Sequence, residues 1–128
     1  MTRLRKSPPH FATLIVALLL LGFSNSMAQD LSNYRWKNRI LSIVTPSLDD
    51  TTYQAQSAAL IAVFPGLLER DIVVLTSIKS TEFEITLVGK DGGEKLTRNS
   101  MLTPEELFAI IDAMPMRLDE MRSSPSSD

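Results

Sequence analysis

The fold is decided by residues 39–75, RILSIVTPSLDDTTYQAQSAALIAVFPGLLERDIVVL. The stretch begins with an apolar run from Arg39 to Thr45, which predicts a strand that stops at Pro46. Its apolar residues fall on both faces, which is typical of a strand inside a sheet. The β-branched run IVVL, at residues 72–75, predicts a second buried strand.

Between these strands, the spacing of the apolar residues predicts a helix. Asp49 and Asp50 offer a helix start, and Pro65-Gly66 is expected to break or end the helix. The apolar residues that recur near helical spacing are Tyr53, Leu60, Val63, Phe64 and Leu67. Since a strand, a helix and a strand form one crossover unit, we expect the two strands to be parallel and the connection to be right-handed.

The second half of the chain predicts a hairpin followed by a helix. FEITLV, at residues 83–88, alternates apolar and polar side chains, which predicts a strand with one solvent-exposed face. KDGG, at residues 90–93, predicts a turn, and residues 94–97 predict the returning strand. TPEE, at residues 103–106, predicts a helix start with a capping box. Pro115 is expected to end that helix or to start a short successor.

The predicted order, β-α-β-β-β-α, is that of a thioredoxin-like α/β fold. The helix that normally lies between the second strand and the hairpin is missing or reduced, at residues 79–81. Because the other two helices pack on one face of such a sheet, we expect the opposite face to be partly open, with Glu82 and Glu84 pointing that way. Tyr34 and Trp36 are placed to cover the remaining apolar surface of this open face. If they do not cover it, we expect the open face to bind a partner.

Residues 1–28 are expected to be a secretory signal peptide. Three basic residues precede the apolar run FATLIVALLLLGF, at residues 11–23, which is shorter than the ~20 residues of a membrane span. SMA, at residues 26–28, suits cleavage by a signal peptidase, and an uncleaved anchor is the alternative. The mature chain divides into a domain, residues 29–122, and a solvated tail, residues 123–128. We therefore expect a periplasmic or secreted protein with no membrane contact after cleavage.

Composition excludes several classes of function. The chain has no cysteine, and its one histidine, His10, lies in the predicted signal peptide. The mature chain therefore lacks the side chains needed for four kinds of site: thiol–disulfide exchange, cysteine peroxidase chemistry, Ser-His triads and His or Cys zinc sites. Cleavage removes three of the 13 basic residues and none of the 15 acidic ones, which leaves a formal charge of −5. We expect no nucleic-acid partner and no cofactor.

Four residues are candidates for catalysis. Asp49 and Asp50 follow the first strand, where open α/β sheets tend to bind ligands, and they suit an acid/base pair or a hard cation. Helix capping is the alternative. Arg70 and Asp71 are further candidates, with a solvated helix end or an ion pair of little energetic value as their alternatives. An enzyme that uses carboxylate or cation-assisted chemistry is thus one hypothesis.

Candidates for binding lie in the predicted turn and beside the aromatic segment. The turn residues are Lys90, Asp91, Gly92 and Gly93. They suit either an anion-binding nest of backbone amides or simply a tight turn. Trp36 and Arg117 are further candidates, because an arginine side chain holds a carboxylate or stacks on an aromatic ring. For Arg117, and for the basic residues near Trp36, a solvated charged surface is the alternative.

Three methionines near the carboxyl end raise a copper hypothesis. Met114, Met116 and Met121 carry thioether sulfurs, which are ligands for Cu(I) in an oxidising compartment. Core filling is the alternative. Because no His or Cys completes such a site, no metal is predicted.

Four blocks of sequence resemble a known family. In order, they are YRWKNRI, LLERDIVVL, LVGKDGGEKL and LFAIIDAMPMRLDEM, and they span about residues 31–121. The chain resembles the thioredoxin-like domains of unknown function called DUDES, which occur as single secreted bacterial domains and in animal extracellular proteins with sushi repeats. The resemblance implies a thioredoxin-like fold, an extracytoplasmic setting and no established activity. Some relatives have been likened to peroxiredoxins, but the residues after the first strand here are TPSLDD, without cysteine.

The leading hypothesis is an exported thioredoxin-like domain without redox chemistry that acts as a binding or interaction module. Its partner is an extracytoplasmic protein or a small ligand, bound through the open sheet face or the loop after the first strand. The carboxylate-based enzyme and the Cu(I) binder are the alternatives.

Overall fold

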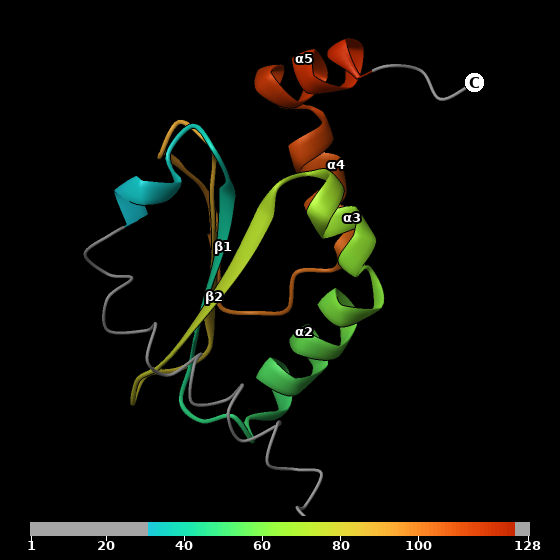
Figure 1. Cartoon of the computed structure of the whole chain (residues 1–128). Helices are drawn as coiled ribbons and strands as arrows, with labels where there is room; N and C mark the ends of the chain where they lie inside the picture. Colours follow the sequence, from blue (N-terminus) through green and yellow to red (C-terminus); the bar gives the residue numbers. More distant parts are fainter. Residues whose placement is uncertain (1–30, 125–128) are drawn as a thin grey trace, which may run out of the picture.

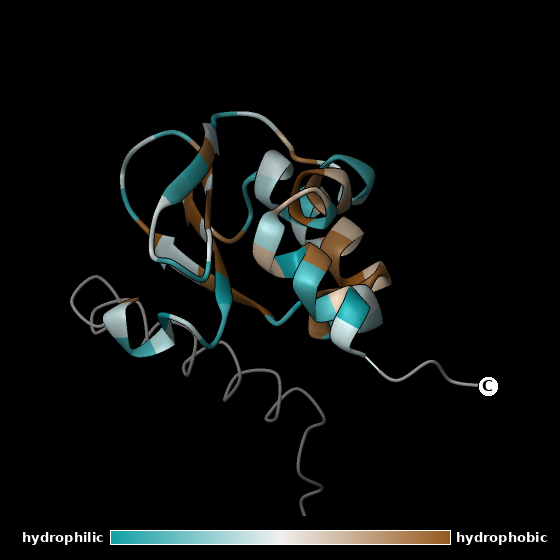
Figure 2. Ribbon diagram, turned by 90° about the horizontal axis from the view of Figure 1, so that it is seen from above, coloured by the Kyte–Doolittle hydropathy of each residue, from teal (hydrophilic) through white to brown (hydrophobic). Residues whose placement is uncertain are grey.

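The computed structural model describes residues 31–124. The predicted signal peptide and the last four residues of the predicted tail lie outside this part of the chain. The described residues form a four-stranded mixed sheet with helices stacked against one face (Figure 1). Seen from above, the sheet and the helices form two layers (Figure 2). No helix in the described part is both long and apolar enough to span a membrane.

The sheet has the strand order β2-β1-β3-β4. Its strands are β1 (Arg39–Thr45), β2 (Ile72–Ile78), β3 (Glu84–Val88) and β4 (Glu94–Arg98). β1 runs parallel to β2 and antiparallel to β3, which in turn runs antiparallel to β4. The predicted parallel pairing is therefore confirmed. β2 extends beyond the predicted run because its register with β1 continues until Ile78 lies opposite Thr45.

The structure has helices between β1 and β2 and after β4, as predicted, and a 3₁₀ helix before β1 that was not predicted. The structure has η1 (Leu31–Tyr34, a 3₁₀ helix), α2 (Thr51–Ala62), α3 (Phe64–Glu69), α4 (Pro104–Asp112) and α5 (Pro115–Ser123). A carboxylate oxygen of Asp50 accepts the N–H of Tyr53 at 2.9 Å and caps α2. The hydroxyl of Thr103 caps α4 by accepting the N–H of Glu106 at 3.2 Å. Both predicted helix starts are confirmed.

The helix break predicted at Pro65-Gly66 lies at Val63 instead. Val63 ends α2 and precedes α3, and Pro65 lies in the first turn of α3. A proline fits there because the N–H groups of a first turn have no intrahelical acceptor. Pro115 starts α5 for the same reason, which is the second of the two outcomes expected for that residue.

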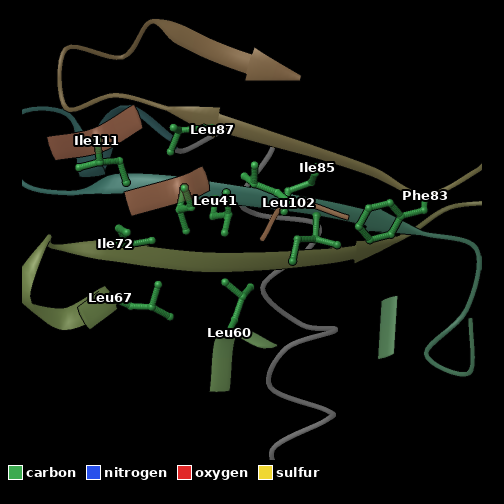
Figure 3. Close-up of a cluster of buried hydrophobic side chains, with 11 residues drawn as sticks. Leu41, Leu60, Leu67, Ile72, Phe83, Ile85, Leu87, Leu102 and Ile111 are labelled. Carbon is green, nitrogen blue, oxygen red and sulfur yellow. The ribbon is translucent and has the colours of Figure 1, made fainter. Parts of the chain in front are cut away.

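The core lies between the sheet and helices α2, α3 and α4 (Figure 3). Leu41 and Ile43 of β1 point toward the helices, and so does Leu87 of β3. All three side chains are at most 1% exposed, so the helices cover the two central strands on this face. No helix forms in residues 79–83, between β2 and β3, as the sequence predicted.

The opposite face of the sheet carries the alternate side chains. Ser42 of β1 lies beside Thr86 of β3, whose hydroxyl is 3.1 Å from that of Thr97 on β4. Of the described helices, α2, α3 and α4 lie on the core side, and η1 lies on the other side near one end (Figure 1). Trp36 does not fold over the sheet: it is 61% exposed and lies at one end of the sheet, because a hydrogen bond from its N–H to the carbonyl of Lys90 fixes it beside the hairpin turn.

A buried amide joins α2 to the connection between β4 and α4. Gln56 is fully buried, and its Nε2 donates to the carbonyl of Leu102 at 2.8 Å. Its Oε1 accepts the N–H of Leu102 at 2.7 Å. Because buried backbone groups need partners, Gln56 fixes this connection against the helix layer.

Replacing Gln56→Leu is expected to lower the free energy of unfolding by about 2–4 kcal/mol, because two buried backbone groups lose their partners. The matched control is Gln54→Leu on the exposed side of α2, where the amide donates to the carbonyl of Leu48 at 3.0 Å in a solvent-exposed hydrogen bond that water can replace, with an expected change of about 0.5 kcal/mol or less. Denaturant unfolding of both variants measures the difference. Equal effects in the two variants would contradict the role given to Gln56.

Candidate functional site

Charged side chains gather at one end of the sheet. This end holds the starts of β1 and β2, the turn after β3 and the junction of α4 with α5. The side chains of this charge cluster are Arg39, Arg70, Lys90, Arg117, Glu69, Asp71, Asp112 and Glu120. Its four cations are only 1–12% exposed. The cations of the cluster are therefore packed against the protein, whereas their acidic partners are 26–63% exposed and face solvent.

Glu120 is the centre of one half of the charge cluster. It accepts Lys90 Nζ at 2.7 Å and the two terminal nitrogens of Arg39 at 3.1 and 3.2 Å. Lys90 also donates to Asp71 at 2.8 Å. Burial acts to raise the pKa of Glu120, but the hydrogen bonds from Lys90 and Arg39 together outweigh burial and lower the pKa below its ordinary value. Ionised Glu120 thus joins α5 to β1 and to the hairpin turn.

Asp112 is the centre of the other half. Arg70 binds it with two hydrogen bonds, from Nε at 3.0 Å and from Nη2 at 2.8 Å, and Arg117 Nε donates at 3.1 Å. The hydrogen bond from Arg70, followed by that from Arg117, lowers the pKa of Asp112 against the effect of burial. The guanidinium of Arg70 also lies over the ring of Phe108, 3.9 Å from its centroid. This half fixes the end of α4 to α3 and α5.

The segment before β1 is held against the hairpin turn. The N–H of Trp36 donates to the carbonyl of Lys90 at 2.6 Å, and Arg35 Nε donates to the carbonyl of Asp91 at 3.0 Å. Trp36 has a φ of 69° and Asp71 a φ of 52°, a conformation that costs most L-residues about 1–2 kcal/mol. Backbone strain of this kind persists only where surrounding contacts impose it, and it concentrates at functional sites.

A cavity of about 660 Å³ opens beside the charge cluster, between Trp36, the hairpin turn and the α4–α5 junction. We call it the edge cavity. Its apolar wall includes Ile110, Met114 and Met116, and its polar wall includes Arg39, Lys90 and Lys95. Cavities of this size, with an apolar lining and a few fixed polar groups, are typical of small-molecule sites.

The structure brings several sequence candidates together at the edge cavity. Trp36, Lys90 and Asp91 line it, as do Met114 and Met116. The third copper candidate, Met121, is 39% exposed on α5 and is not part of the lining. Within residues 31–124, no group of three or more His, Cys, Asp or Glu side chains is arranged to hold a metal ion.

The glycines of the turn serve its geometry. Gly92 has a φ of +86°, and its N–H donates to the carbonyl of Gly89 at 3.0 Å. The N–H of Gly93 donates to the side chain of Asp91 at 2.9 Å. The interpretation of residues 90–93 as a tight turn therefore explains their backbone conformation and hydrogen bonds.

Arg70, Asp71 and Arg117 lie in the charge cluster behind the edge cavity. The interpretation of Arg70 and Arg117 as solvated side chains is wrong, since they are 12% and 6% exposed, whereas the ion-pair alternative for Arg70 agrees with its contact to Asp112. Each is buried because it pairs with Asp112, which lies far from Arg70 in the sequence.

Asp49 and Asp50 lie at the other end of the sheet, after β1 (Figure 1). Asp50 caps α2, and the N–H of Asp49 donates to the hydroxyl of Ser47 at 3.2 Å. The charge cluster begins at Arg39, the first residue of β1, so the length of this strand separates the two sets of charges. The structure does not bring all the catalytic candidates into one site.

Sequence reasoning missed Glu69, Asp112 and Glu120. Important partners of two of these residues are distant in the chain: Glu120 binds Arg39, 81 residues away, and Asp112 binds Arg70, 42 residues away. One signal was available, because Arg39 is a charged residue at the start of an otherwise apolar strand. Such a residue is buried only with a partner of opposite charge.

Comparison with known families places the chain. The model of a family described as a domain of unknown function (DUF4174) matches residues 30–81 and 75–120. The chain belongs to the DUF4174 family. A comparison of this DUF4174 chain with curated proteins gives no match.

Among solved structures, the DUF4174 chain is similar to the reduced 2-Cys peroxiredoxin of Plasmodium vivax. The TM-score is 0.57 and the sequence identity 12%, over 71% of this chain and 84% of that chain. At this identity the likeness shows the fold, and the predicted thioredoxin-like fold is confirmed. The DUF4174 chain has no cysteine, so it is a thioredoxin-like domain without thiol chemistry.

Replacing Glu120→Gln is expected to lower the free energy of unfolding at pH 7 by about 2–3 kcal/mol, because Arg39 and Lys90 stay charged and lose their shared counter-ion. Glu82→Gln, in the exposed segment before β3, is the control, with about 0.5 kcal/mol or less. Denaturant unfolding at pH 7 gives both values.

The same variant tests the pH dependence. Because the pKa of Glu120 is lowered in the folded state, its ion pairs stabilise the fold above the ordinary pKa of 4.5, and this stability is lost as the pH falls through the folded-state pKa. The wild-type protein should therefore lose more stability than Glu120→Gln between about pH 6 and pH 3. Identical pH profiles would contradict the role of Glu120.

Proposed function

We propose that this chain is an exported, cysteine-free thioredoxin-like binding module whose site is the edge cavity. The observation that carries the proposal is the cavity itself, about 660 Å³ in volume, with one apolar wall and one wall of buried or half-buried cations. Proteins use this combination to bind small molecules. By contrast, Asp50 in the loop after β1 is occupied as a helix cap.

The charge cluster gives the edge cavity a preformed wall. Arg39 comes from β1, Lys90 from the hairpin turn and Met116 from α5. Glu120 binds both Arg39 and Lys90, so three separate segments are fixed relative to one another. A wall that is already ordered reduces the entropic cost of binding a ligand.

The arrangement favours binding over catalysis. The pKa values of Asp112 and Glu120 are lowered, whereas a general acid at neutral pH needs a raised pKa. Cu(I) binding by Met114 and Met116 is disfavoured, because cationic side chains line the same cavity and repel a metal ion.

Export is supported by the sequence. The basic start, the short apolar run and the small residues at 26–28 form the pattern of a cleaved signal peptide. The resemblance to the DUDES group implies the same extracytoplasmic setting. A binding role needs no thiols, so the absence of cysteine is compatible with this function.

We expect the full chain, expressed with a carboxyl-terminal tag in a bacterium, to be recovered outside the cytoplasm with Gln29 as its first residue. Ala28→Phe should accumulate as the uncleaved precursor, because signal peptidases require a small residue before the cut. Amino-terminal sequencing and cell fractionation provide the readout. Cytoplasmic recovery of the intact chain would overturn the proposed export.

Trp36 is the only tryptophan of the chain and lines the edge cavity, so its fluorescence reports on this site. Titration of the mature domain with 1-octanol should shift the Trp36 emission to shorter wavelengths and reach saturation, since an apolar chain displaces water from the ring. Met116→Asp should weaken this binding by about tenfold, through loss of apolar contact.

Met121→Asp is the matched control. Met121 lies on the same helix with nearly the same exposure, 39% against 38% for Met116, but outside the lining of the edge cavity. Its binding of 1-octanol should equal that of the wild type. A shift that does not saturate, or an equal loss in both variants, would overturn the proposed site.

A further inference from the structure

We infer that the ligand of the edge cavity is a small carboxylate with an apolar body, and this inference rests on the proposed function. The polar wall of the cavity carries three cationic side chains, Arg39, Lys90 and Lys95, and one carboxylate, that of Asp91. An oxygen anion is the ligand group that satisfies such a wall.

Lys90 has one donor to spare. An ammonium group carries three N–H donors, and Asp71 and Glu120 accept two of them at 2.8 and 2.7 Å. The Lys90 side chain is only 9% exposed, so bulk water has little access to the third donor. Because Lys90 lines the edge cavity, an acceptor within the cavity is suited to this donor.

Arg39 has a donor without an acceptor. Its side chain is 1% exposed, and its terminal nitrogens donate to Glu120 and to the carbonyl of Arg70. Its Nε is buried and has no hydrogen-bond partner among the described residues. Buried donors are rarely left unpaired in folded proteins. Arg39 also lines the edge cavity, so an anion placed against this wall lies beside a buried cation.

The start of α5 lies in the same lining. Met114 precedes the helix and makes no side-chain cap, and Pro115 and Met116 form its first turn. The N–H groups of a first turn have no intrahelical acceptor, and the helix dipole favours negative charge there. All three residues line the edge cavity, so the helix dipole and the cations of the opposite wall favour the same sign of charge.

Asp91, an acidic residue of the lining, does not offer a free site for a cation. It accepts the N–H of Gly93 at 2.9 Å and Lys95 Nζ at 3.0 Å, and these two hydrogen bonds lower its pKa. Lys95 is 33% exposed and keeps donors for a ligand at the mouth of the cavity.

The rest of the lining sets the remainder of the ligand. Ile110, Ala113 and Met116 present apolar surface opposite Trp36, and a methionine side chain adapts to ligands of irregular shape. Glu120 and Asp71 already neutralise part of the cationic charge, so a single negative charge fits better than a doubly charged phosphate. An aliphatic or aromatic body therefore lies along the apolar wall, with its carboxylate at Lys90, close to the buried charge of Arg39.

Three probes with the same chain separate the charge from the apolar contribution: octanoate, 1-octanol and octylammonium. With Trp36 fluorescence of the mature domain as the readout, octanoate should bind about tenfold more tightly than 1-octanol, as one additional charge-assisted hydrogen bond provides. Octylammonium should bind most weakly. Lys95→Gln should reduce the preference for octanoate, and Lys79→Gln, an exposed lysine outside the lining, should not.

The outcomes distinguish the two claims. Equal binding of octanoate and 1-octanol, or tighter binding of octylammonium, overturns the carboxylate and leaves the edge cavity as a binding site. No saturable binding of any probe overturns the site together with the carboxylate. An equal loss of preference in Lys95→Gln and Lys79→Gln overturns the role of this wall and assigns the effect to the overall charge of the protein.

Discussion

The carboxylate of Glu120 holds together parts of the chain that are far apart in sequence. It binds Arg39 at the start of β1 and Lys90 after β3, and Arg117 joins it to the second centre of the charge cluster, Asp112. The three cations are almost completely buried. Removing one partner from such a network leaves an uncompensated buried charge, so the position of α5 depends on it.

This dependence explains why the candidate site lies where it does. A thioredoxin-like sheet offers two ends, and in this chain the end after β1 carries a helix cap at Asp50. The opposite end carries the charge cluster, two residues with positive φ and the edge cavity. Chain segments that the charge cluster fixes supply both walls of that cavity. The fold of this DUF4174 chain is thus compatible with a ligand site that does not require a thiol.

The sequence predicted the architecture well because the architecture follows from local patterns. The apolar run of β1, the alternation in β3 and the cap at Thr103 each specify an element within a few residues. The position of Pro65 was misjudged because a proline stops a helix in its interior and is favoured in its first turn. Only the tertiary structure shows that a new helix begins there.

The candidate site was only partly predictable, for a related reason. Trp36, Lys90 and Met116 were recognised as single residues, but no local pattern places them around one cavity. Arg117 was expected at a solvated surface because its burial follows from the packing of α5 against α3 and α4, although its partner Asp112 is only five residues away. Glu120 has no motif around it, and its role follows from the packing of α5 alone.

The most direct test of this account is a map of backbone amide chemical shifts of the mature domain, from Gln29 onward, upon titration with octanoate. The account predicts that the largest changes occur at Trp36, at the hairpin turn around Lys90 and at the start of α5 around Met116. Changes concentrated at Asp49 and Asp50, in the loop after β1, would contradict it and place the functional site at the other end of the sheet.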